Sequence, residues 1–113
     1  MRIAVRAALL LAVSAAPAAA AETIVGRWGE SREVCSGAMS LDIAPMGLRS
    51  EEFACDFTDV SRVGDVVTWK GRCFVGEEPP RKETVVATLH SDRSLTMVFH
   101  GSGVNIENLR RCR

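Results

Sequence analysis

The stretch that decides the fold reads Val67-Thr68-Trp69-Lys70-Gly71-Arg72-Cys73-Phe74-Val75. Every second residue, from Val67 through Trp69 and Cys73 to Val75, belongs to one mostly apolar set, and the residues between them are mostly polar. In an extended strand, successive side chains point to opposite faces, so a period of two marks a strand that is buried on one side. The stretch therefore predicts a half-buried strand rather than a helix.

The same period of two recurs elsewhere in the chain, and turn-forming residues separate the repeats. The repeats are Phe53-x-Cys55-x-Phe57, Val85-x-Ala87-x-Leu89 and Leu95-x-Met97-x-Phe99. The turn signals are Pro45-Met46-Gly47, Val63-Gly64-Asp65, residues 76–80, Ser91-Asp92-Arg93 and Gly101-Ser102-Gly103. Short strands with turns at regular spacing are typical of an antiparallel meander that closes into a small barrel.

We therefore predict an all-β fold, a small antiparallel up-and-down β-barrel of about seven to eight strands. The predicted strands cover residues 24–29, 39–44, 48–58, 65–75, 83–90, 94–100 and 105–112. A barrel of this size is normally filled by its own side chains. The large side chains expected to fill it are Phe53, Phe57, Trp69, Met97 and Phe99.

Residues 1–21 have the pattern of a secretory signal peptide. Arg2 and Arg6 give a positive start, an apolar stretch follows, and an alanine triplet ending at Ala21 fits the cleavage rule. We expect cleavage near Ala21, one domain over residues 22–113, and a location in the periplasm or outside the cell. No later segment is apolar enough to span a bilayer, which needs about 20 apolar residues.

The charge of the expected mature chain argues against general binding to polyanions. The full chain has 14 basic and 14 acidic side chains, and removing Arg2 and Arg6 leaves 12 basic against 14 acidic, a net charge of −2. Nonspecific binding to nucleic acid or anionic lipid needs a positive footprint. We therefore expect no nucleic-acid partner.

All four cysteines lie in the mature part, at Cys35, Cys55, Cys73 and Cys112. An even number in a short exported chain predicts two disulfides. Zinc sites usually contain closely spaced cysteine pairs, and these cysteines are far apart in the sequence.

Two pairings follow from the turns. A hairpin turn at Gly64 places Cys55 opposite Cys73 and leaves Cys35 for Cys112. A turn at the preceding proline-glycine segment pairs Cys35 with Cys55 and leaves Cys73 for Cys112. Strand order around a closed meander favours the first arrangement, because the strand of Cys73 and the last strand lie far apart.

The chain resembles calycin-type barrels in the sequence Gly26-Arg27-Trp28, which matches their G-x-W signature. The resemblance implies that Trp28 plugs one end of the barrel and that an arginine of the last strand, Arg110 or Arg111, packs over it.

The spacing of the tryptophan and the next two cysteines also resembles the periplasmic inhibitors of serralysin-type metalloproteases. That resemblance implies a disulfide between Cys35 and Cys55, and on this ground we prefer the pairing that joins Cys73 to Cys112. The chain departs from the family because only residues 22–25 precede Gly26, too few for an inhibitory tail. The full set of tryptophans and cysteines resembles small exported β-barrel proteins of α-proteobacteria, a resemblance that implies no activity.

No catalytic, cofactor or metal site is expected. His90 and His100 each follow an inward apolar residue, and neither has a second ligand at metal-binding spacing. Nucleophilic catalysis needs a base beside the nucleophile, and the serines show no such motif. We therefore expect a non-enzymatic protein.

The most conspicuous loop predicted to be exposed covers residues 76–82, which two prolines stiffen. A rigid loop on a sheet is suited to recognition, because little order is lost on binding. We expect Glu77, Glu78 and Arg81 to contact a partner protein of the cell envelope, with the chain itself a monomer. The alternatives are an inhibitor of a secreted protease or lysozyme, and a structural or stress-related envelope protein.

Overall fold

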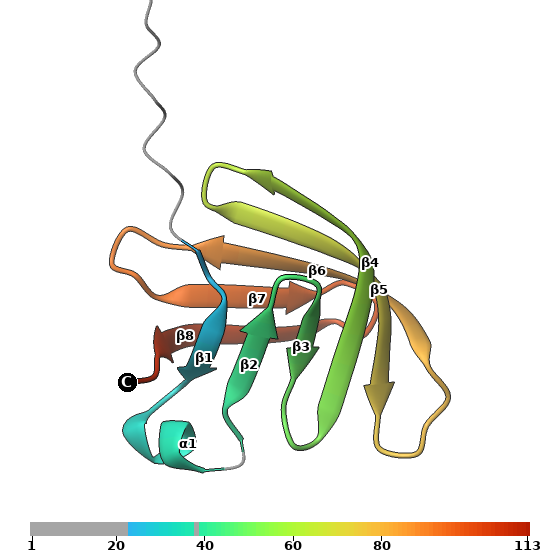
Figure 1. Ribbon diagram of the computed structural model, residues 1–113, viewed down its shortest axis with the longest axis horizontal. Helices are drawn as coiled ribbons and strands as arrows, with labels where there is room; N and C mark the ends of the chain where they lie inside the picture. The colour runs from blue at the N-terminus through green and yellow to red at the C-terminus, as the bar shows by residue number, and fades with distance from the viewer. Residues whose placement is uncertain (1–22, 38) are drawn as a thin grey trace, which may run out of the picture.

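The computed structural model describes residues 23–37 and 39–113, which form a closed antiparallel barrel of strands β1 to β8 in chain order (Figure 1). The strands are β1 Gly26–Gly29, β2 Leu41–Ala44, β3 Gly47–Arg49, β4 Phe53–Val63, β5 Val66–Val75, β6 Arg81–Leu89, β7 Leu95–Phe99 and β8 Val104–Arg111. One short helix, α1 Arg32–Ser36, follows β1. The predicted all-β barrel is confirmed, and the predicted signal peptide lies outside the described residues.

Pairing of the first and last strands closes the barrel. Trp28 of β1 lies opposite Arg111 of β8, and every other strand pairs with its neighbours in sequence. Closure leaves no free sheet edge to pair with another chain. Because the strands alternate in direction, the connections β1–β2, β3–β4, β5–β6 and β7–β8 lie at one end of the barrel and the other three lie at the opposite end.

The predicted strand over residues 48–58 is wrong, because a turn divides it into β3 and β4. The backbone N–H of Ser50 donates a 2.8 Å hydrogen bond to the carbonyl of Phe53, which closes the turn. A continuous strand would place Leu48 on the face opposite Cys55, since they differ by an odd number of residues. With the turn, Leu48 lies directly opposite Cys55, and both are fully buried.

The barrel interior is filled by side chains. Val85, Ala87, Leu95 and Met97 have no exposed surface, and the rings of Phe57 and Trp69 stack with centroids 5.3 Å apart. Of the five side chains predicted to fill it, four are buried and the partly buried Phe53 packs against them.

One end of the barrel is closed by Trp28, which is 1% exposed. The guanidinium of Arg111 lies 4.6 Å from the centre of its ring, and the indole N–H donates to the carbonyl of Ile24 over 2.9 Å. Arg110 points elsewhere and forms an ion pair with Asp92. Of the two arginines considered for this position, Arg111 is therefore the one that packs over the tryptophan.

The disulfides join Cys35 to Cys112 and Cys55 to Cys73, so the preferred pairing of Cys35 with Cys55 and Cys73 with Cys112 is wrong. Cys55 and Cys73 lie directly opposite each other on β4 and β5, with Cα atoms 4.0 Å apart. Barrel closure brings the end of β8 beside β1, where the N–H of Cys112 donates to the carbonyl of Arg27. Cys112 thus reaches Cys35 in helix α1.

Candidate functional site

The barrel opens at the end opposite the Arg111–Trp28 contact into a pocket of about 330 Å³, which we call the mouth. Its apolar floor consists of Phe53, Cys73, Val75, Pro79, Phe99, Val104 and Ile106. Its polar rim consists of Glu52, Glu78, Arg81, Glu83 and Ser102. The mouth therefore combines an apolar floor with a charged border.

The apolar floor lies where β4, β5, β7 and β8 begin or end. The inward-facing side chains at these strand ends are not covered by a further layer of side chains. Phe53 and Phe99 meet edge to face, with ring centroids 5.7 Å apart. Above them, Val75 and Val104 are 48% and 49% exposed. Isolated exposed valines are common on protein surfaces, but here they border one concave apolar pocket.

The loop that the sequence analysis singled out forms one side of the mouth. Glu78 and Arg81 both line it, and their side chains form an exposed ion pair at 3.8 Å. The N–H of Glu78 donates to the carbonyl of Val75 over 3.0 Å, which closes a tight turn at Gly76. Glu77 is exposed on the same turn and does not line the mouth.

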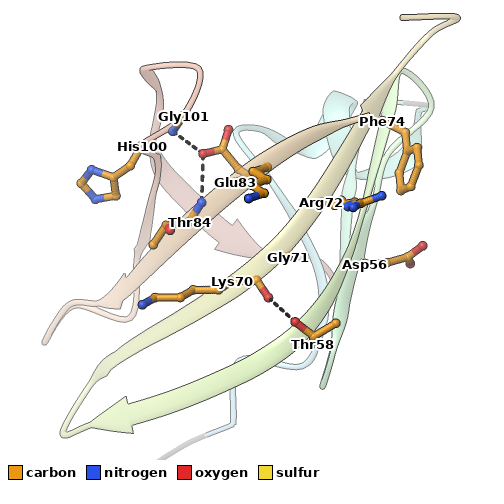
Figure 2. Close-up of a pocket in the computed structure, with 11 residues that line it drawn as sticks. Asp56, Thr58, Lys70, Gly71, Arg72, Phe74, Glu83, Thr84, His100 and Gly101 are labelled. Carbon is orange, nitrogen blue, oxygen red and sulfur yellow. Dashed lines mark hydrogen bonds between the residues drawn. The ribbon is translucent and has the colours of Figure 1, made fainter. Parts of the chain in front are cut away.

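The most unusual polar group at the mouth is Glu83 of β6, a carboxylate only 5% exposed. Its oxygens accept hydrogen bonds from the backbone N–H groups of Gly101, Ser102 and Thr84, two of which are drawn in Figure 2. Charge-assisted hydrogen bonds of this kind are about twice as strong as neutral ones. Glu83 thus fixes the β7–β8 turn against β6 and holds Val104 at the mouth.

Gly101 is required for this contact. A side chain there would place its Cβ 2.7 Å from a carboxylate oxygen of Glu83 and 2.9 Å from the carbonyl oxygen of Lys82. Glu83 was not among the site residues predicted from the sequence, although the sequence contained a signal for it. Glu83 has the same parity as Val85 and Ala87, so the alternation already placed it on the inward face.

The two histidines lie away from the mouth. Nε2 of His90 lies 2.8 Å from the hydroxyl of Thr96, and His100 lies on the outer face of the barrel. Within residues 23–37 and 39–113, no group of three or more acidic, histidine or cysteine side chains could hold a metal ion. In the same part of the chain, no helix is long and apolar enough to cross a membrane.

Asp92 lies in the β6–β7 turn at the tryptophan end. The hydroxyl of Ser94 donates to its carboxylate over 2.6 Å, and the backbone N–H of Ser94 donates over 2.9 Å. These hydrogen bonds favour the charged form and lower the pKa of Asp92 below its ordinary value. The hydrogen bonds of Asp92 stabilise the β6–β7 turn, which lies outside the mouth.

The chain matches no protein-family model, no curated protein and no solved structure. The resemblance to calycin-type inhibitors therefore stays a prediction.

Proposed function

We propose that this protein is a non-enzymatic binding module of the periplasm or the extracellular space, and that it recognises a partner protein through the mouth. The observation that carries the proposal is the apolar pocket of about 330 Å³, bordered by half-exposed valines and by the charged β5–β6 loop. Two disulfides agree with a location outside the cytoplasm.

The size of the mouth favours one anchoring side chain over a whole lipid or drug-sized ligand. Small-molecule sites usually enclose about 300–1,000 Å³, so the mouth is at the lower limit. In the described part of the chain, Met97 and the buried side chains around it fill the interior below the mouth, so a ligand would stay near the rim. Protein interfaces commonly depend on a few large side chains inserted into such pockets.

The charges around the mouth indicate what should flank the anchor. Glu52 and Glu78 line the rim, and Glu77 is exposed beside it, whereas Arg81 is already paired with Glu78. Acidic groups are therefore in excess, and complementary charge speeds association and selects partners. We infer a partner segment that carries a leucine, methionine or phenylalanine flanked by lysine or arginine.

Titration of the ¹⁵N-labelled mature protein with a synthetic peptide, one leucine flanked by lysines on both sides, tests this directly. We expect saturable shifts of the amides of Phe53, Val75 and Val104. Peptides with serine in place of leucine, or with glutamates in place of the lysines, should bind at least about tenfold more weakly.

A matched pair of variants distinguishes specific binding at the mouth from nonspecific hydrophobic binding. The double variant Val75→Ser, Val104→Ser should lose about tenfold or more in affinity, because it removes the apolar border. The double variant Val63→Ser, Val66→Ser removes two valines at the opposite end, 80% and 36% exposed, and should bind normally. Equal losses in both variants, or shifts that avoid the mouth, would overturn the proposal.

A further inference from the structure

A second concave surface lies on the outer face of the barrel, over β4, β5 and β6, and we call it the outer hollow. It encloses about 860 Å³, and its floor includes Gly71. Figure 2 shows Lys70, Arg72 and Phe74 following one another along β5, with Asp56 and Thr58 on one side and Thr84 and His100 on the other.

Close approach of two strands forms the floor. β4 carries an irregularity between Phe57 and Asp59, where its register against β5 shifts. A Cβ at Gly71 would lie 2.2 Å from the backbone oxygen of Asp56 and 2.6 Å from the Cα of Phe57. Only glycine fits this position, so backbone atoms of β4 and β5 form the floor of the outer hollow here.

Basic side chains are concentrated in the outer hollow. Lys70 and Lys82 are the only lysines of the chain, and both line it together with Arg72 and His100. Arg72 and Lys82 lie directly opposite each other on β5 and β6. Like charges in directly opposed positions repel each other, and an anion bound between Arg72 and Lys82 would relieve this repulsion.

The carboxylates that line the outer hollow form no ion pair with these cations. Asp56 lies directly opposite Arg72 in the register but forms its ion pair with Arg49, at 3.8 Å, and Glu83 uses its oxygens on backbone N–H groups. Asp59 is opposite Lys70 in the register, yet no ion pair joins them. In the part of the chain that the structure describes, Lys70, Arg72 and Lys82 have no ion-pair partner.

The spacing of the three cations fits a compact anion. Directly opposed side chains on neighbouring strands are about 5 Å apart at Cβ, and residues two apart on one strand are about 7 Å apart. Lys70 and Arg72 extend in different directions from β5 in Figure 2, and rotation of these long side chains would bring both to one phosphate group, with the hydroxyl of Thr84 beside them. Phe74, 36% exposed, lies two residues beyond Arg72 and offers a ring on which a sugar can pack.

We propose that the outer hollow binds a phosphorylated saccharide, with Lys70, Arg72 and Lys82 on the phosphate and Phe74 against the sugar ring. The phosphate could belong to a soluble sugar phosphate or to the head group of a glycolipid. The site is separate from the mouth. The net charge of −2 expected for residues 22–113 argues against general polyanion binding without opposing a local site.

The test is a titration of the ¹⁵N-labelled mature protein with glucose 1-phosphate, with inorganic phosphate and with glucose. We expect saturable shifts at residues 70, 72 and 82 with both phosphates, further shifts at Phe74 with glucose 1-phosphate, and none with glucose. Flotation with phosphatidylcholine vesicles, with and without monophosphoryl lipid A, distinguishes the sources. Binding to the lipid A vesicles alone assigns the glycolipid, and binding to soluble glucose 1-phosphate alone assigns the free sugar phosphate.

Variants connect the binding to the named cations. Arg72→Gln and Lys82→Gln should each weaken glucose 1-phosphate binding about tenfold, the loss expected for one charge-assisted hydrogen bond. The melting temperature of Lys82→Gln should stay equal or rise, because this variant removes the like-charge pair, whereas Arg72→Gln also removes the charge opposite Asp56. Arg27→Gln, at an exposed ion pair on β1, is the matched control and should bind normally. Unchanged affinity in both hollow variants, equal losses in the control, or no saturable shift with any phosphate or vesicle would overturn the proposal.

Discussion

The carboxylate of Glu83, on β6, accepts a hydrogen bond of 3.1 Å from the backbone N–H of Ser102, in the turn between β7 and β8. The N–H of the preceding residue, Gly101, donates to the same carboxylate. A single acidic side chain thereby connects β6 to the β7–β8 turn, and both border the mouth. The relationship explains why a nearly buried carboxylate is tolerated, since its oxygens have hydrogen-bond donors on three backbone groups.

Replacing this carboxylate should destabilise the fold. Glu83→Ala leaves the N–H groups of Gly101 and Ser102 without their acceptor, and we expect a loss of about 2–3 kcal/mol in the free energy of unfolding. Glu83→Gln keeps one acceptor oxygen and should lose less. Urea denaturation followed by circular dichroism measures both variants. Glu78→Ala, which removes only an exposed ion pair, should change stability by less than about 0.5 kcal/mol. Equal stability of Glu83→Ala and wild type would show that water replaces the carboxylate.

The two disulfides should differ in their contribution to stability. The bridge Cys35–Cys112 joins residues 77 apart, whereas Cys55–Cys73 joins residues 18 apart. In the chain-entropy model these loops contribute about 4.5 and about 3 kcal/mol. Alanine replacement of both cysteines of a bridge, followed by thermal denaturation, should therefore destabilise more for the longer loop. A larger loss for the shorter loop would show that packing around the fully buried Cys55 dominates over loop entropy. Peptide mapping without reductant should recover only these two pairings.

The barrel itself could be predicted from the period of two, because inward and outward positions are fixed by parity alone. The same parity contained two details that the strand assignment missed. Leu48 and Cys55 cannot share a face within one strand, so a turn is needed between them, and Glu83 must face inward with Val85. Alternation around Gly64 also indicated the pairing of Cys55 with Cys73, and the family resemblance led to the wrong preference.

The outer hollow could not be predicted in this way. Arg72 and Lys82 are separated by a loop, and a shift of one residue in the register would place them on opposite faces. Only the observed pairing of β5 with β6 puts their charges together. The mouth was predictable in part: the loop of Glu78 and Arg81 was identified, but the apolar floor beneath it depends on where four strands end.

The pKa of Asp92 can be tested by carbon-detected NMR titration of its carboxyl group. Hydrogen bonds from the side chain and backbone of Ser94, assisted by Arg110, should hold the pKa below the ordinary value of 3.8. Ser94→Ala removes the hydroxyl donor and should raise the pKa towards that value. Because the folded pKa is lowered, the stabilising contribution of Asp92 is complete above the unfolded pKa and is lost as the pH falls through the folded pKa. Asp92→Asn should remove this part of the acid sensitivity, and an unchanged acid transition would contradict the assignment.

Arg111 should stabilise the barrel more than its neighbour Arg110, although both are arginines at the end of β8. The guanidinium of Arg111 lies 4.6 Å from the centre of the Trp28 ring and donates hydrogen bonds to the carbonyls of Val25 and Thr23, over 2.9 Å and 2.6 Å. A cation over a tryptophan face contributes about 0.5–2 kcal/mol, and each net hydrogen bond about 1 kcal/mol. Arg111→Ala should therefore lower the free energy of unfolding by about 2 kcal/mol. Arg111→Lys keeps the charge but loses the planar guanidinium group, which donates several hydrogen bonds and stacks on the ring. This variant should therefore still lose more than half as much stability as Arg111→Ala.

Arg110→Ala is the matched control, because the side chain of Arg110 binds the exposed Asp92 turn, through a 2.8 Å hydrogen bond to its backbone and an ion pair at 3.3 Å. Exposed pairs of this kind contribute about 0–1 kcal/mol. Urea denaturation followed by far-UV circular dichroism measures all three variants, since it does not depend on the fluorescence of the two tryptophans. If Arg110→Ala destabilises as much as Arg111→Ala, the end of β8 is stabilised by charge in general. If only Arg111→Ala does so, the contact with Trp28 and the carbonyls around it holds this end of the barrel closed.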